Sequence, residues 1–173
     1  MRWPEIRQIH LDAAAELAAS AERVPAERWM SPRAEGKWSP AETVEHLALA
    51  YDTLLRELAG GPGMALRTKL WQRILLRFTM VPKLLRGGGF PAGARSPRET
   101  RPQSANPDQK AAVAVFRERA AQFDAQVAAA MTSGRRVRLT HAYFGKAGLA
   151  EAMLLCARHV QHHQKQLSPP LPP

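Results

Sequence analysis

Apolar residues recur at intervals of three and four along most of this 173-residue chain, which is the spacing of one buried face of an α-helix. No alternating apolar run is long enough to predict a sheet. Proline and glycine clusters divide the periodic stretches into five predicted helices, at about 4–23, 39–59, 64–86, 106–133 and 149–167. The spacing therefore predicts an all-α fold, a helical bundle.

Two helix starts carry strong local signals. Ser39-Pro40-Ala41-Glu42 is a capping box with proline at the first helical position, so Ser39 and Glu42 can each accept from an otherwise unpaired backbone N–H. The fourth helix is predicted to start at Asn106-Pro107-Asp108 and to end at Gly134. Pro82 predicts a break or kink in the third helix, because proline removes a helical N–H.

A segment rich in glycine and proline separates the third and fourth helices, at about 87–105. Loops of this length inside compact domains are often functional, and this one favours a crossover connection over a strict up-down order. The chain length suits one domain, which we expect to span 1–167. The tail 168–173, SPPLPP, is predicted to be a flexible proline-rich end.

Composition argues against several classes of protein. No run of 18 apolar residues occurs, so we expect no membrane span, and the start lacks the apolar core of a secretory signal. Cys156 is the only cysteine, so neither an intrachain disulfide scaffold nor a zinc site built on several thiolates is expected. A cytoplasmic location is the default expectation.

The net charge of +10 is concentrated in the middle of the chain, where residues 59–119 hold 12 basic and 3 acidic side chains. A basic block can bind nucleic acid or anionic lipid. A solvated face is the simpler interpretation of segment 64–101, and without a recognised motif we do not expect nucleic-acid binding. Arg95, Arg98 and Arg101 in the long loop could recognise an anionic substrate, but a solvated loop is the favoured interpretation.

Three of the six histidines fall within five residues near the end of the last predicted helix. His159 and His163 are four residues apart, so they lie on one side of the helix, toward its apolar stripe. That spacing allows two imidazoles to chelate one metal ion, although hydrogen-bonded core histidines have the same spacing by chance. His162 points further outward and becomes a ligand only if the helix is rotated.

A third metal ligand has to come from elsewhere, and His46 is the best candidate. The helical wheel places His46 opposite the stripe that runs from Val44 to Leu58, which predicts a surface histidine. The alternative is that this helix presents a second face to a cleft where His46 meets the histidine pair. His141 precedes an aromatic loop and is a weaker candidate for the border of the site. Cys156 is expected in the core.

Two stretches of the chain, GKWSPAETVEHL (36–47) and THAYFGKAGLAEAMLLCARHVQHHQKQL (140–167), resemble the DinB-like family of metal-dependent proteins. The matching positions are Trp38, Ser39, Glu42, His46, Leu47, Phe144, Gly145, Glu151, His159, His163 and Gln166. The chain departs from the family pattern at His141-Ala142, where the family usually has His-Pro, and at Gly148, where it usually has serine or threonine.

The resemblance implies a four-helix bundle with an accessory helix, often dimeric, and a divalent metal ion held by His46, His159 and His163. It also implies a metal-dependent thiol S-transferase or hydrolase that acts on a small molecule, with a low-molecular-weight thiol as a candidate substrate. Imidazole ligands suit Zn, Ni or Fe. The alternative is a non-catalytic dimeric binding module with a structural or vestigial metal site.

Overall fold

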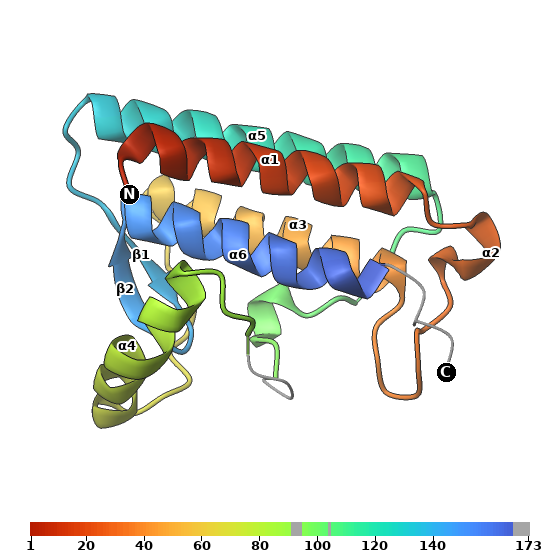
Figure 1. Ribbon diagram of the computed structural model, residues 1–173, viewed down its shortest axis with the longest axis horizontal. Coiled ribbons are helices and arrows are strands. Elements are labelled where there is room, and N and C mark those ends of the chain that lie inside the picture. Colours follow the sequence, from red (N-terminus) through yellow and green to blue (C-terminus); the bar gives the residue numbers. More distant parts are fainter. Residues whose placement is uncertain (91–94, 104, 168–173) are drawn as a thin grey trace.

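The computed structural model describes residues 1–90, 95–103 and 105–167. Four long helices form a bundle (Figure 1): α1 (Trp3–Glu22), α3 (Pro40–Leu58), α5 (Gln109–Thr132) and α6 (Leu149–Leu167). α1 and α3 lie diagonally opposite, and each packs against both α5 and α6. The all-α prediction is confirmed, and the predicted flexible tail 168–173 lies outside the described residues.

The helix directions explain the long connection before α5. Gln109, at the start of α5, donates to the carbonyl of Val24 just after α1 at 3.0 Å, so α1 and α5 are antiparallel. Arg135, just after α5, donates to the carbonyl of Leu58 at the end of α3 at 3.1 Å, so α3 and α5 run in the same direction. The chain must therefore cross the length of the bundle between them, as the long loop predicted.

The helix boundaries follow their capping signals closely. The Ser39 hydroxyl accepts from the N–H of Glu42 at 3.2 Å, and the Glu42 carboxylate accepts from the N–H of Ser39 at 2.7 Å, so the predicted capping box is confirmed. The Asp108 carboxylate likewise accepts from the N–H of Ala111 at 3.1 Å at the start of α5. Glu42 is therefore occupied as a helix cap.

Several details of the helices differ from the prediction. The third helix, α4 (Leu70–Leu85), begins six residues later than expected, and Pro82 lies within its final turn without ending it. Only one N–H is lost there, and buried Val81 and Leu84 hold the turn against the bundle. The first connection contains a short helix, α2 (Ala26–Trp29), and the described part of the long loop contains a 3₁₀ turn, η1 (Arg98–Thr100).

A small antiparallel hairpin connects α5 to α6, where the sequence predicted only a short linker. Its strands are β1 (Arg138–His141) and β2 (Gly145–Gly148), and Leu139 pairs with Ala147. Strands of four residues are too short for alternation to reveal them. The Glu57 carboxylate accepts from the N–H and the hydroxyl of Thr140, at 2.7 and 2.6 Å, which fastens the hairpin to the end of α3.

Helix α4 lies outside the bundle and packs against α6 (Figure 1). Its Arg77 forms an ion pair with Glu151 on α6 at 2.8 Å. Within the described residues, no helix combines the length and the hydropathy needed to cross a membrane.

Candidate metal centre

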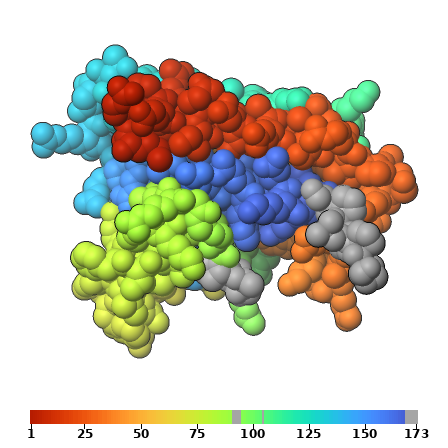
Figure 2. Space-filling model, viewed as in Figure 1, coloured from red at the N-terminus to blue at the C-terminus, as the bar shows by residue number. Residues whose placement is uncertain are grey.

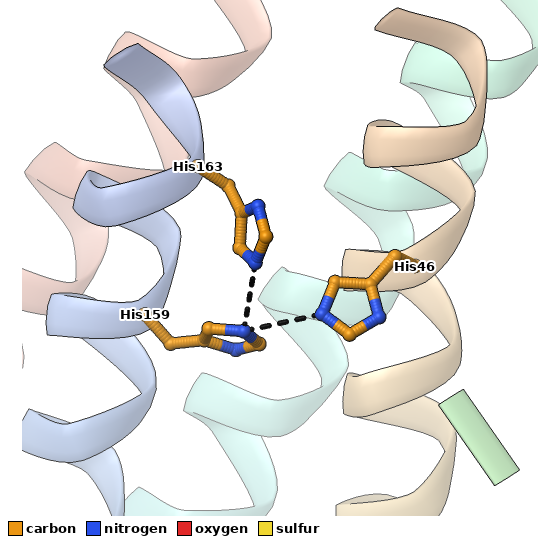
Figure 3. Close-up of side chains that lie close together, drawn as sticks. All are labelled: His46, His159 and His163. Atoms are coloured by element: carbon orange, nitrogen blue, oxygen red, sulfur yellow. Dashed lines mark hydrogen bonds between the residues drawn. The ribbon is translucent and has the colours of Figure 1, made fainter. Parts of the chain in front are cut away.

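His46 on α3 and the pair His159 and His163 on α6 point toward one another across the helix interface (Figure 3). The Nε2 atom of His159 lies 3.1 Å from Nε2 of His46 and 3.0 Å from Nε2 of His163. One nitrogen from each of the three rings falls within 4.8 Å of the other two. Residues separated by more than 110 positions are thus brought to one point.

The helical-wheel prediction of an exposed His46 was wrong, since the residue is only 4% exposed. α3 has a second buried face, to which Thr43, His46 and Thr53 belong. The turn η1 packs against α3, and its Thr100 carbonyl accepts from Nδ1 of His46 at 2.6 Å. A segment 54 residues away in sequence covers this face, so helical periodicity alone does not reveal the burial.

Hydrogen bonding determines which ring nitrogens carry protons. A backbone carbonyl can only accept, so Nδ1 of His46 is the protonated nitrogen and Nε2 keeps its lone pair. Nδ1 of His163 lies 3.0 Å from Oε1 of Gln166, which sets the same tautomer. Two lone pairs are therefore directed at the common point, and each ring is oriented by an acceptor behind it, as is usual for metal-bound histidines.

Burial also favours the neutral form of all three rings. It lowers the pKa of His46 to about 4 and that of His163 to about 3, because the charged imidazolium would lose its hydration. The pKa of His159 is lowered by burial and by the neighbouring histidines. Neutral imidazoles are metal ligands as they stand, so no proton has to leave before an ion binds at neutral pH.

The donor set fits a divalent ion on chemical grounds. Three Nε2 atoms meet at hydrogen-bond distance, yet a neutral His159 has at most one Nε2 proton to offer to two acceptors. In at least one of the two Nε2–Nε2 contacts, the lone pairs of the two nitrogens face each other without a proton between them. A cation bound by all three nitrogens removes that repulsion, and three imidazoles are an established ligand set for catalytic zinc.

Two aromatic side chains cover the histidines. The indole ring of Trp38 lies 4.7 Å from the ring of His46 and 6.1 Å from that of His163, measured between centroids. Phe90 lies 5.4 Å from His159. Trp38 directly precedes the Ser39 cap, so the same capping box that starts α3 also fixes where the indole enters the site.

A cavity of about 780 Å³ extends from the histidines. Its apolar wall comes from α3, α4, α6 and the hairpin, and includes Leu54, Leu76, Met80, Phe144 and Leu155. Its charged lining residues are Arg33, Lys37, Arg95 and Arg101. Within the described part of the chain, no aspartate or glutamate lines this cavity. The space therefore suits a ligand with an apolar body and an anionic group.

The remaining sequence candidates lie at the edges of the site. His162 is half-buried against Phe90 and is not one of the three converging rings. His141 lines the cavity, stacks on Phe144 at 4.3 Å and accepts from the N–H of Tyr143 at 3.2 Å through Nδ1. Burial raises the pKa of the Cys156 thiol to about 12, in keeping with its predicted place in the core.

Several residues that shape the site carried no recognisable functional signal in the sequence. The Thr100 carbonyl is a backbone group, which residue identity does not reveal. Phe90, Arg33 and Lys37 lie in connecting segments whose positions depend on the assembled bundle.

Residues 10–167 match the family model of the DinB superfamily. A search of curated proteins and a search of solved structures each found no match.

Proposed function

Because this chain belongs to the DinB superfamily, we propose that it is a metal-dependent enzyme whose divalent ion is held by His46, His159 and His163. The reaction class we propose is transfer of a small-molecule thiol or hydrolysis by water. The observation that carries the proposal is the convergence of three Nε2 atoms, two of which are oriented by acceptors behind their rings.

A divalent ion bound by three neutral imidazoles keeps open positions and its full charge, and lowers the pKa of a bound thiol or water. Zn, Ni and Fe all suit this ligand set. A structural zinc site, in contrast, is normally closed by four protein ligands. The cavity beside the histidines therefore favours catalysis over a purely structural ion.

The surrounding side chains have separable tasks in this proposal. Trp38 and Phe90 exclude bulk water from the histidines, which strengthens electrostatic interactions within the site. Arg95 and Arg101 orient a carboxylate or another anionic group of the substrate. The apolar wall receives the remainder of the molecule.

His141 adds one hydrogen-bond donor to the cavity. Its Nδ1 accepts from the N–H of Tyr143, so in the neutral ring the proton resides on Nε2. Burial lowers the pKa of His141 to about 4, which keeps the ring neutral at physiological pH. We assign it the task of donating to a substrate oxygen that gains negative charge during the reaction.

The test is metal analysis of protein purified without a histidine tag and reconstituted with Zn or Ni. The wild type should retain about one equivalent, and His46→Ala, His159→Ala and His163→Ala should each lose it. His162→Ala is the matched control, because it removes an adjacent imidazole from the same helix and should retain the metal. Retention of a full equivalent by His159→Ala would contradict the proposed site.

Activity is then tested with a panel of thiol acceptors and esters, with and without reconstituted metal. Turnover that requires the metal and disappears in His159→Ala is the expected result. A metal-loaded protein that turns over no member of the panel would favour the binding-module alternative.

A further inference from the structure

Helix α4 exposes a continuous apolar face to solvent. We define the outer stripe of α4 as Leu70, Trp71, Ile74, Leu75 and Phe78. The exposed fractions within it range from 51% at Ile74 to 80% at Phe78. These residues follow the three- and four-residue spacing of one helix face. Figure 2 shows α4, in yellow-green, protruding from the body of the molecule.

The opposite face of α4 accounts for its attachment to the protein. Val81 and Leu84 are buried, Leu76 and Met80 line the cavity, and Arg77 pairs with Glu151 on α6. The outer stripe is therefore not needed to hold the helix in place. Apolar surface that is concentrated in this way usually marks an interaction site.

The charge around the stripe indicates what binds there. The sequence from Ala59 to Arg98 contains eight lysine or arginine residues and no aspartate or glutamate. Four of these cations are exposed on or beside α4: Arg67 and Lys69 before it, Lys83 in its last turn and Arg86 just after it. Of the ion pairs found among the described residues, only that of Arg77 involves a cation of this segment.

A helix with an aromatic and aliphatic face flanked by lysine and arginine has the composition that binds in the plane of an anionic membrane surface. We propose that α4 docks on anionic phospholipid, with Trp71 and Phe78 inserted at the acyl boundary and the flanking cations on the headgroups. Trp and Phe are well suited to that depth, and each nearby cation adds electrostatic attraction to an anionic leaflet.

The same charges argue against a second copy of α4, and against nucleic acid, as the binding partner of the outer stripe. In a symmetric pair of α4 helices, the exposed cations of both copies would be brought together with no carboxylate from this segment between them. A nucleic-acid backbone would satisfy the cations but would leave five large apolar side chains against phosphates or water. A lipid surface offers anions and an apolar layer at the same place.

The test is co-sedimentation of the full chain with phosphatidylcholine vesicles that contain about a third phosphatidylglycerol, compared with pure phosphatidylcholine. The wild type should bind the anionic vesicles more tightly, and added salt should weaken binding. The variant W71S/F78S should bind at least about tenfold more weakly, because each side chain contributes its apolar burial. The emission of Trp71 should shift to the blue on binding, and W71F should lose that shift.

The matched control is L11S/V115S, which removes two exposed apolar side chains from α1 and α5 instead. It should bind vesicles as the wild type does. Three outcomes would overturn the proposal: no binding of the wild type to anionic vesicles at low salt, equal binding by W71S/F78S, or a wild-type dimer that W71S/F78S converts to monomer. The metal site is untouched by these variants, so the result stands independently of the proposed enzyme activity.

Discussion

The Nδ1 atom of His46 lies 2.6 Å from the carbonyl oxygen of Thr100, although 54 residues separate the two in sequence. This contact connects the long crossover to α3 and directs Nε2 of His46 toward the other two histidines. Gln166 plays the corresponding part for His163, through Oε1 at 3.0 Å from Nδ1. The orientations of His46 and His163 therefore depend on groups that do not themselves face the common point.

Gln166→Leu should weaken metal affinity by about 10- to 100-fold, because His163 loses the acceptor that fixes its tautomer and ring orientation. Competition with a chromogenic chelator measures the change. Gln164→Leu is the control, since Gln164 bonds to Ser20 on α1 and should leave metal affinity unchanged. Equal affinities for wild type and Gln166→Leu would show that Gln166 has no part in orienting the ligand.

Metal binding should stabilise the folded protein, since the three proposed ligands are assembled only when α3 and α6 pack together. A free ion concentration of about 1,000 times Kd adds about 4 kcal/mol to the free energy of unfolding, or roughly 10 °C in Tm for a chain of this size. Thermal unfolding followed by circular dichroism, with and without Zn, measures the shift. His162→Ala should keep it, and a comparable shift in His159→Ala would argue that the ion binds elsewhere.

His10 should make stability depend on pH. It is fully buried, its Nε2 lies 2.9 Å from the hydroxyl of Tyr51, and burial lowers its pKa to about 4. Asp124 and Arg7 face it with opposite and smaller effects on that pKa. Above about pH 6.5, His10 is neutral in both the folded and the unfolded protein. As the pH falls below about 6.5, His10 becomes protonated in the unfolded protein but stays neutral in the folded protein.

Stability should therefore fall as the pH drops from about 6.5 to about 4, and His10 accounts for roughly 3 kcal/mol of that loss. His10→Gln keeps a polar group near Tyr51 but cannot titrate there, so its stability should fall less over the same range. Urea unfolding of metal-free wild type and variant at several pH values gives the comparison. The ligand histidines contribute equally to both proteins, so identical pH profiles would rule out a role for His10.

Ser39→Ala should lower the free energy of unfolding by about 1 kcal/mol, because the first turn of α3 loses a cap for the N–H of Glu42. That corresponds to a fall in Tm of roughly 2–4 °C. Ser31→Ala removes an exposed serine hydroxyl that bonds to the carbonyl of Glu27 in the short helix α2, and it should have little effect. A larger loss in Ser31→Ala than in Ser39→Ala would contradict this account of α3.

The sequence by itself determined the parts of this protein that depend on neighbours along the chain. The capping box at Ser39, the start of α5 and the one-turn spacing of His159 and His163 are local, because they involve residues within one or two turns. The motifs around them were enough to indicate the family, and the family match confirms it.

Only the tertiary structure decided the rest. Burial of His46 requires the distant turn η1 to cover the second face of α3, and helical periodicity cannot record a contact that a remote segment supplies. The basic lining of the cavity and the solvent-exposed stripe of α4 likewise depend on where the segments between the bundle helices lie in the assembled protein. A helix wheel shows which residues share a face, but only packing determines whether that face meets protein, ligand or water.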